Sequence, residues 1–463
     1  MSTMYPASES KREKHFYDLD VDQLFVAQES VESNARSYPR RIPLTITHAE
    51  GSYIYDSKGR KFIDCLACAG ALPLGHNHPE VAEAAIEYLQ QKGPLQALDL
   101  TTPAKNAFID RLYETLPEGW RENYRIQFCG PGGSDAVEAA TKLVKYATGR
   151  ENVLSFHGAY HGMSQYSLGL TGNLKARNGI PAQANGVHFL PYPYVYRSSF
   201  GKTEEEVSKR NFHYIRNLLH DPESGVSRPA GIIMEAIQGE GGVIPAPKAW
   251  LRDMRELTRS LDIPMIIDEV QTGLGRTGQN FAFEYADIEP DVLVLSKALG
   301  GGFPMSVVLY HSSLDKWHPG SHAGTFRGNQ IAMISGAKTM QILERDSLPT
   351  SAAMNGEHFK AMLESLQSRF TCIGDVRGRG LMLGLEIVFP DGELDINEHP
   401  KAAPQIASSV QFEALRRGLI LEPGGRHSSV LRFLPPLNTP REVLEEAVAI
   451  LEDSFIAALP NIK

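Results

Sequence analysis

Four short and almost continuously apolar runs recur between residues 125 and 310, with turns and longer helical patterns between them. The runs are RIQFC (125–129), GIIMEAI (231–237), PMIIDEV (264–270) and DVLVLSK (291–297). A strand that is exposed on one face alternates apolar and polar residues, whereas a strand that is buried on both faces is apolar throughout. The runs therefore predict an α/β fold in which helices cover a mostly parallel sheet.

The C-terminal part of the chain has a different pattern. The segment VLRFLPPL (430–437) is a candidate strand. Thr439, Pro440 and Glu442 then match the cap, the first helical residue and the third residue after the cap of a helix. This pattern predicts a second, smaller α+β unit.

A strand pattern near the start of the chain, THAEGSYIYDSKGRKFID (47–64), contains a turn signal at Lys58–Gly59 and is expected to join the smaller unit. The predicted organisation has three parts. They are an N-terminal tail with part of the small domain (1–75), a large cofactor-binding domain (76–345) and the C-terminal small domain (346–463).

Composition and charge exclude several classes of protein. The 463 residues include 46 Lys and Arg against 55 Asp and Glu, a net charge of −9, which argues against a nucleic-acid-binding protein. The chain has no apolar run of about 18 residues for a membrane span. Its first 16 residues lack the apolar core of a secretory signal and predict a mobile tail.

The chain has four cysteines, too few for a disulfide framework in a protein of this length. Cys65 and Cys68 form a C-x-x-C with no second pair nearby, so we expect small buried residues rather than a redox pair or a metal site. Together with the absence of a signal, these features predict a cytoplasmic protein without a metal.

A glycine-rich turn in GPGGSDAVEAA joins the first of the apolar runs to a helical pattern. A strand, a glycine turn and a helix start together can bind an anion, because free backbone N–H groups and the positive end of the helix dipole face outward. Gly132 and Gly133 would let a phosphate approach closely, and Ser134 would add a hydroxyl. From this segment alone the alternative is an ordinary tight turn, with Asp135 and Glu138 capping the helix.

Two charged residues stand at the ends of later apolar runs. Asp268 closes a strand pattern, and such a carboxylate points into the usual ligand crevice of an open α/β sheet. Lys297 precedes three glycines, where burial and nearby positive charge would lower its pKa, as a Schiff-base lysine requires. This pairing suits pyridoxal phosphate (PLP), whose ring nitrogen needs an acid. The alternatives are local capping by Asp268 and an exposed Lys297.

Gly273, Gly275 and Gly278 match the G-x-G-x-x-G pattern of dinucleotide-binding sites. Such a site requires a helix to begin at the glycines. The chain continues instead as NFAFEYADIEPD, which is aromatic and turn-like, so we do not expect a dinucleotide site here.

The ordered motifs resemble those of the class III, or ω-, aminotransferases of PLP fold type I. The resemblance extends from about residue 30 to residue 455 and rests on GHNHP, GPGGSDAVEAA, FHGAYHG, IQGEGG, IIDEVQTGLGRTG, SKALGGGFP and GTFRGN. It implies a large domain with a mostly parallel seven-stranded sheet and a smaller α+β domain from both chain ends. It also implies PLP as cofactor, and ping-pong transfer of an amino group between a small-molecule donor and a 2-oxo acid acceptor.

The resemblance implies roles for residues around the cofactor. Lys297 would bind PLP covalently, and Asp268 would pair with the pyridine nitrogen. Gln271 would lie near the 3-oxygen of the ring, and Gly133 and Ser134 would hold the phosphate.

Further roles concern the faces of the ring and a second subunit. Tyr160 would stack on the ring with His161 beside it. Glu235 would lie under the cofactor, although the family often has proline where this chain has Ala236. Thr325 would reach the phosphate of the neighbouring subunit, so the resemblance implies a homodimer with shared active sites.

Glu240 and Arg432 are the expected substrate residues. Arg432 would bind the α-carboxylate of 2-oxoglutarate or glutamate, and Glu240 would cover it when the other substrate has no carboxylate there. Met163 stands where relatives acting on 4-aminobutyrate or acetylornithine carry arginine, and a thioether cannot form that ion pair.

Within the family, the segments AYHGM, CLACAG and HAGTFRGN resemble most the diaminobutyrate–2-oxoglutarate aminotransferases. These move the terminal amine of L-2,4-diaminobutyrate and have aspartate 4-semialdehyde as the keto partner. The alternatives are an ω-aminotransferase for another diamine or a β-amino acid, and a PLP aminomutase or racemase of the same fold.

Overall fold

The computed structural model describes residues 17–180 and 185–459. The predicted N-terminal tail, residues 1–16, lies outside the described residues. None of the helices within the described ranges has both the length and the apolar character that a membrane crossing requires.

The centre of the fold is a seven-stranded sheet. Its strands are, in spatial order, β4 (Tyr124–Phe128), β12 (Val307–His311), β11 (Val292–Leu295), β10 (Met265–Asp268), β7 (Gly231–Met234), β5 (Val153–Phe156) and β6 (Val187–Leu190). Only β12 runs antiparallel to its neighbours. All four apolar runs of the sequence contribute strands to this sheet, which confirms the predicted α/β fold.

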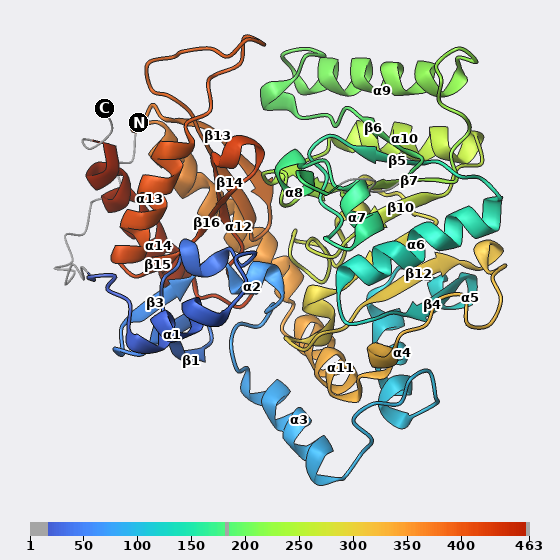
Figure 1. Cartoon of the computed structure of the whole chain (residues 1–463), viewed down its shortest axis with the longest axis horizontal. Helices are drawn as coiled ribbons and strands as arrows, with labels where there is room; N and C mark the ends of the chain where they lie inside the picture. The colour runs from blue at the N-terminus through green and yellow to red at the C-terminus, as the bar shows by residue number, and fades with distance from the viewer. Residues whose placement is uncertain (1–16, 181–184, 460–463) are drawn as a thin grey trace, which may run out of the picture.

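Helices cover both faces of the sheet, which explains why its strands are apolar throughout (Figure 1). Along β10, Ile266 packs into a core with α6, whereas Met265 and Ile267 pack into a second core with α10 and α11. The α-helices around the sheet are α3 (Pro79–Gln90), α4 (Pro103–Thr115), α5 (Trp120–Asn123), α6 (Gly133–Thr148), α7 (Gln165–Leu170), α8 (Leu174–Arg177), α9 (Glu204–His220), α10 (Lys248–Ser260) and α11 (Gln330–Arg345).

The two ends of the chain build the smaller part together. In Figure 1 the blue N-terminal strands lie beside the orange and red C-terminal elements. Parallel pairing of β3 with β15 joins them, as the sequence predicted. One sheet contains β1 (Ile46–Glu50), β2 (Tyr53–Asp56), β3 (Lys61–Asp64) and β15 (Leu419–Ile420). The other contains β13 (Ile373–Arg379), β14 (Met382–Ile387), β17 (Val430–Phe433) and β16 (Glu422–Gly424).

The remaining helices of these segments are α1 (Gln23–Val31), α2 (Ala67–Gly70), α12 (Leu348–Gln367), α13 (Pro404–Arg416) and α14 (Arg441–Ala458). The predicted turn at Lys58–Gly59 is present, with the Gly59 N–H donating to the Asp56 carbonyl at 3.0 Å. The division of the chain at residues 75 and 345 stays a prediction.

Two local predictions were wrong. Helix α14 begins at Arg441 with Pro440 as its N-cap, because Thr439 is buried and its hydroxyl hydrogen-bonds to Ser52 Oγ at 2.8 Å instead of capping the helix. Cys65 is buried as expected, but Cys68 is exposed. Ala67 to Ala69 all have positive φ, and among them the Cys68 side chain is exposed whereas Ala67 is buried.

The glycines that match the G-x-G-x-x-G pattern lie in turns. The chain passes from β10 through Gly273, Gly275 and Gly278 into the 3-10 helix Ala282–Ala286, and no α-helix begins at the glycines. The segment therefore lacks the helix that a dinucleotide-binding site requires.

Candidate active site

A cavity of about 360 Å³ opens where β7, β10 and β11 end. Its volume is in the range of small-molecule sites. The predicted site residues that line it are Gly133, Ser134, Tyr160, His161, Glu235, Glu240, Asp268, Gln271 and Lys297. Strand ends and the turns that follow them supply most of these side chains, as expected for the carboxyl edge of an open α/β sheet.

Asp268 is the last residue of β10 and is buried at the floor of this cavity. One carboxylate oxygen lies 2.8 Å from His161 Nδ1, and the other accepts the Val270 N–H at 3.0 Å. Because both oxygens have fixed partners, the orientation of the carboxylate is set before any ligand binds.

Lys297 follows β11 by two residues and begins a 3-10 turn, Lys297–Gly300. Its φ of +48° lies in the left-handed region, which is costly for a residue with a Cβ and is found most often at functional sites. Burial lowers the pKa of Lys297, while Glu240 acts in the opposite direction. A lowered pKa favours the neutral amine, which is the nucleophilic form.

The glycine turn and the start of α6 form one wall of the cavity. The helix begins at Gly133 with Gly132 as its N-cap. The suggested capping residues are engaged elsewhere, since Asp135 accepts from Gly130 N and His322 Nε2, and Glu138 accepts from residues 164–167. The Asp135 N–H donates to the Gly132 carbonyl at 3.0 Å, and the N–H groups of Gly133 and Ser134 are left for a ligand.

Glu235 ties two cavity segments together. Its carboxylate oxygens accept the N–H groups of Tyr160, at 3.0 Å, and of Gly239, at 2.9 Å. Burial raises the pKa of Glu235 to about 7. This carboxyl thus fixes both the predicted stacking residue and the residue that precedes Glu240.

Arg432 lies outside the cavity lining but pairs with Glu240, which does line it. The guanidinium is buried, with Nη1 2.7 Å from Glu240 Oε1 and Nη2 2.9 Å from Glu422 Oε2. Burial alone would raise the pKa of Glu240, but the pairing with Arg432 lowers it to about 2. The pair predicted from sequence is present.

The second carboxylate, Glu422, was missed by sequence reasoning. It lies on β16, directly across from Arg432 in the register, and also binds Arg41 Nη1 at 3.1 Å. The segment LILEPGG gives a weak signal, a lone acid between an apolar run and a glycine turn. Strand pairing, which the sequence does not display, brings the two residues together.

Thr325 is the predicted cofactor residue that the described chain does not bring to the cavity. It lies exposed in the 3-10 turn Thr325–Gly328, and it is not among the lining residues. The same segment contacts α6, where His322 Nε2 lies 3.1 Å from the Asp135 carboxylate.

The donor set of the cavity fits a phosphorylated pyridine aldehyde. His161 Nε2 and Gln271 Oε1 are buried without a hydrogen-bond partner among the described residues, so a polar ring substituent beside them would complete their bonding. At Gly133 a Cβ would lie 3.0 Å from both methyl groups of Val270, so a larger residue would displace Val270, which lines the cavity. A lysine amine and an oriented carboxylate stand in the same cavity.

Comparison with known proteins agrees with this geometry. Residues 34–455 match the family model described as aminotransferase class-III. The chain belongs to the class-III aminotransferases. A diaminobutyrate–2-oxoglutarate aminotransferase from Rhizobium meliloti (strain 1021) is 52% identical, with 92% of this chain and 91% of the relative covered. One of the same name from Haemophilus influenzae is 43% identical, with 94% and 95% covered.

A solved transaminase structure shares the architecture. An amine transaminase from an uncultivated Pseudomonas species, solved in its PLP-bound form, superposes with a TM-score of 0.82 at 27% identity and covers 92% of this chain and 98% of its own. The family and this neighbour identify the fold as PLP fold type I and the cofactor of this aminotransferase as PLP.

Proposed function

We propose that this aminotransferase moves the terminal amine of L-2,4-diaminobutyrate to 2-oxoglutarate, with aspartate 4-semialdehyde as the keto partner. The observation that carries the proposal is the buried Arg432 paired with Glu240 at the edge of the cavity. Arg432 suits the carboxylate of a 2-oxo diacid, and Glu240 can neutralise it in the other half-reaction. The names of the relatives support diaminobutyrate as the donor.

PLP, when bound, supplies an electron sink for the carbon that loses and gains a proton. In the proposed mechanism Lys297 holds the cofactor and carries this proton. Asp268, oriented by His161, keeps a proton on the ring nitrogen. Gly133 and Ser134, with the start of α6, hold the phosphate.

The remaining residues shape the two faces of the site. Tyr160, whose N–H is fixed by Glu235, would stack on the ring. Gln271 would lie beside the 3-oxygen, held there by its amide Nε2, which donates to Ala69 O at 3.2 Å and to Glu240 Oε1 at 3.5 Å. These side chains exclude water and restrict the angle at which substrate enters.

The two substrates place opposite demands on Arg432. The α-carboxylate of 2-oxoglutarate matches a guanidinium through two parallel hydrogen bonds, a geometry that lysine cannot copy. The diamino acid presents a terminal ammonium instead, and an uncompensated buried arginine would disfavour it. Glu240 meets both demands when its side chain pairs with Arg432 in one half-reaction and moves aside in the other.

The proposal is tested by donor choice. The PLP-loaded enzyme is expected to form glutamate from 2-oxoglutarate with kcat/KM at least about tenfold higher for L-2,4-diaminobutyrate than for 4-aminobutyrate or β-alanine, which lack the second amine (a factor of ten corresponds to about 1.4 kcal/mol). Glutamate is measured enzymatically. Preference for a control donor would overturn the substrate, and no glutamate with any donor would favour the aminomutase or racemase alternative.

Arg432→Ala is expected to slow the 2-oxoglutarate half-reaction by about 100-fold or more, since a charge-assisted bidentate contact contributes roughly 2–5 kcal/mol. The diaminobutyrate half-reaction should change much less. Glu240→Ala should show the opposite bias. Single-turnover absorbance changes of the bound cofactor measure each half separately.

The matched variants are Arg432→Lys and Glu240→Gln. Arg432→Lys keeps the charge but not the guanidinium that makes two parallel hydrogen bonds, and Glu240→Gln keeps the shape of the side chain but not its charge. Arg432→Lys should recover little of the 2-oxoglutarate half-reaction. If Arg432→Ala slowed both half-reactions equally, the role of Arg432 would be structural. The proposed exchange of partners between Glu240 and Arg432 would then be wrong.

We also infer that the active unit is a homodimer in which Thr325 serves the phosphate of the partner subunit. Its support is the exposed Thr325 segment, which the His322–Asp135 contact holds against the helix that begins at Gly133. Exposed Phe326 beside it is an apolar surface that a second subunit could cover.

The four free cysteines support a cytoplasmic location.

A further inference from the structure

The segment that carries Glu240 packs against a set of paired residues in the sheet formed by β13, β14, β17 and β16. We define this gate loop as residues 239–243, between β8 (Ile237–Gln238) and β9 (Ile244–Pro245). The register of the sheet aligns Arg377 on β13 with Gly384 on β14, and Gly384 with Arg432 on β17. Directly paired residues share a face of a sheet. Two arginines therefore stand on one face with a glycine between them.

The two arginines hold different parts of the gate loop. Arg432 binds the side chain of Glu240. Arg377 binds the backbone, with Nε donating to the Gly242 and Val243 carbonyls at 3.0 and 3.1 Å, and Nη2 donating to Gly242 at 2.7 Å. Arg377 thus fixes the loop but makes no contact with the carboxylate that exchanges partners.

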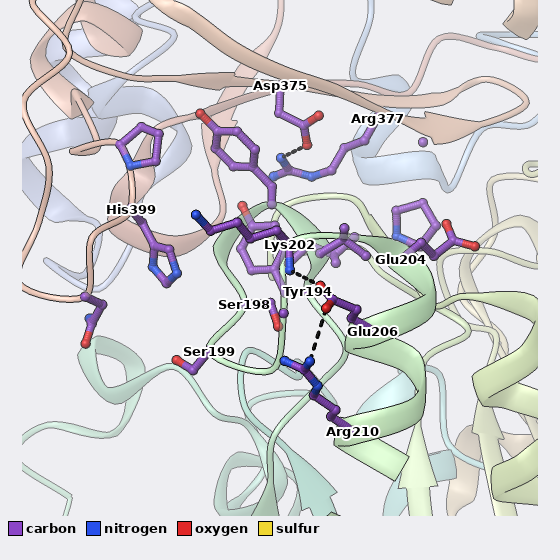
Figure 2. A pocket seen from close by; sticks show the side chains of 18 of the residues that line it. Tyr194, Ser198, Ser199, Lys202, Glu204, Glu206, Arg210, Asp375, Arg377 and His399 are labelled. Atoms are coloured by element: carbon purple, nitrogen blue, oxygen red, sulfur yellow. Dashed lines mark hydrogen bonds and ion pairs between the residues drawn. The ribbon is translucent and has the colours of Figure 1, made fainter. Parts of the chain in front are cut away.

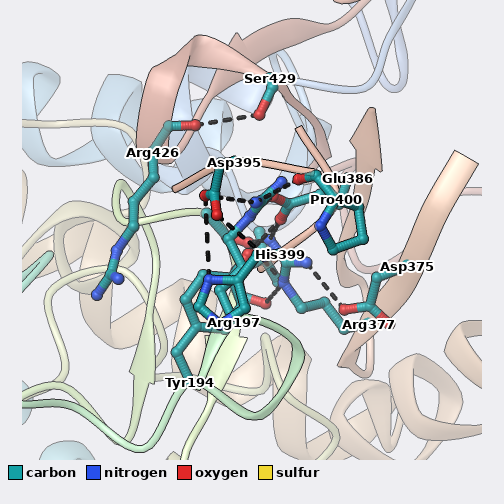
Figure 3. Close-up of polar contacts among 12 residues, drawn as sticks. Tyr194, Arg197, Asp375, Arg377, Glu386, Asp395, His399, Pro400, Arg426 and Ser429 are labelled. Carbon is teal, nitrogen blue, oxygen red and sulfur yellow. Dashed lines mark hydrogen bonds and ion pairs between the residues drawn. The ribbon is translucent and has the colours of Figure 1, made fainter. Parts of the chain in front are cut away.

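Two carboxylates, one of them fully buried, orient Arg377 in turn (Figure 3). Glu386 Oε2 lies 2.7 Å from Arg377 Nη2, and Asp375 Oδ2 lies 2.9 Å from Nη1. Glu386 is fully buried and also pairs with Arg197 Nε at 2.6 Å. Burial alone would raise the pKa of Glu386, but Arg377 and Arg197 lower it, so the carboxylate stays charged and keeps its partners.

The gate loop has no free space on the sheet side. A Cβ on Gly384 would lie 3.1 Å from Val243 Cβ, and one on Gly242 would lie 3.2 Å from Gly425 Cα. Toward the turn that follows β5, a Cβ on Gly241 would meet the Gly158 carbonyl at 2.5 Å. The backbone is therefore packed against its neighbours, and only the Glu240 side chain is free to change partners.

A cavity of about 1140 Å³ adjoins the end of the gate loop. Arg377 lines it (Figure 2), as do Ile244 and Pro245, the residues that follow the loop, whereas residues 239–243 are not among its lining residues. Without the Arg377 hydrogen bonds, the Gly242 and Val243 carbonyls lose the donors that hold this end of the loop, so the loop can shift and carry Glu240 away from Arg432.

We propose that Arg377 is a positioning residue that holds the gate loop against Gly384, so that Glu240 covers Arg432 by rotation of its side chain alone. This inference rests on the proposed exchange between Glu240 and Arg432. It assigns Arg377 to the diaminobutyrate half-reaction, in which Glu240 must cover Arg432, although Arg377 lies outside the cofactor cavity.

Arg377→Met is expected to slow the diaminobutyrate half-reaction about tenfold, as for a lost hydrogen bond to a charged group, and the 2-oxoglutarate half-reaction less than about threefold. Arg377→Lys, which can still reach one carbonyl, should fall between Arg377→Met and the wild type. The matched control is Arg379→Met. Arg379 lies on the same strand and lines the same cavity, but its guanidinium lies over the Tyr285 ring and donates to Ala246, outside the loop.

Whereas the half-reaction is expected to slow in Arg377→Met, the binding of an unreactive diacid is expected to become tighter. Glutarate, an unreactive diacid, competes with Glu240 for Arg432, so a loosened gate loop should let it bind about threefold tighter to Arg377→Met than to the wild type. Titration calorimetry on the PLP-loaded enzyme measures this. General damage to the fold would weaken binding, and that result would overturn the proposal.

The double variants isolate the mechanism. In a Glu240→Ala background, Arg377→Met should leave the ratio of the two half-reactions unchanged, since no carboxylate remains to be positioned. Gly384→Ala would displace the loop through contact with Val243 without removing a charge, and it should reproduce the bias of Arg377→Met. It replaces Arg377→Met in the test if Arg377→Met does not fold. Equal losses in both halves, or a bias that persists without Glu240, would overturn the proposal.

Failure of this inference is distinguishable from failure of the proposed function. If the wild type forms no glutamate from diaminobutyrate and 2-oxoglutarate, the proposed function fails. If the wild type does so while Arg377→Met and Arg379→Met behave alike, only the positioning role fails.

Discussion

Replacing Lys297 with alanine is expected to lower transamination turnover by more than about 1000-fold, because one side chain would serve both as the covalent anchor and as the proton carrier. The residue follows a fully buried strand, its backbone is in the left-handed region, and burial lowers its pKa. These features place the amine in the cavity and favour its neutral form. Steady-state glutamate formation measures the loss.

Lys145→Ala is the matched control. Lys145 lies on α6 outside the cavity lining, and burial lowers its pKa as well. It should retain near-normal turnover. Borohydride treatment of the PLP-loaded wild type, followed by peptide mass spectrometry, should locate the cofactor adduct on Lys297. An adduct on another lysine would contradict the assignment.

The same variant tests the shared site. When Lys297→Ala chains are mixed with Thr325→Ala chains, each hybrid dimer contains one site with both changes and one site with neither. Activity should therefore return on mixing. If mass spectrometry shows that subunits have exchanged and no activity returns, Thr325 does not serve the partner subunit.

Residues whose position follows from local sequence could be predicted. Asp268 and Lys297 each stand at the end of an apolar run, and parallel strands bring such ends to one edge of a sheet. Gly133 and Ser134 follow the first run directly, at a helix start. For these residues the order of strand, turn and helix determines the location, and the structure places all four in one cavity.

Residues whose position depends on pairing between distant strands could not be predicted. Glu422 reaches Arg432 through the register of β16 and β17, and Arg377 reaches the gate loop through the register of β13, β14 and β17. The role of Thr439 also depends on a residue that is distant in the chain. Its local pattern suggests a helix cap, but its partner Ser52 is 387 residues away in the chain. Family resemblance identified Glu240 and Arg432, yet not the groups that hold them.

Asp268→Ala is expected to leave PLP bound but to lower kcat by about 100-fold or more, a loss comparable to that of a preorganised electrostatic contact in other active sites. A carboxylate beside the ring nitrogen keeps it protonated, and a neutral pyridine is a weak electron sink. The buried contact with His161 Nδ1 at 2.8 Å fixes the carboxylate in the orientation that this role needs. Asp268→Asn retains the shape of the side chain and should lose nearly as much, because an amide cannot hold the charge.

The neighbouring acid provides the control for Asp268. Glu269 is equally buried, but it accepts from the Phe283 N–H at 2.9 Å and from the Thr272 hydroxyl at 2.6 Å, away from the cavity. Because Glu269 does not line the cavity and Glu269→Gln keeps the shape of the side chain, this variant should leave kcat near that of the wild type. Absorbance of the bound cofactor separates loss of PLP from loss of chemistry in each variant. If Asp268→Ala retained near-normal kcat with PLP bound, the ring nitrogen would need another acid, and the described residues that line the cavity offer only Glu235 and Glu240, both already engaged.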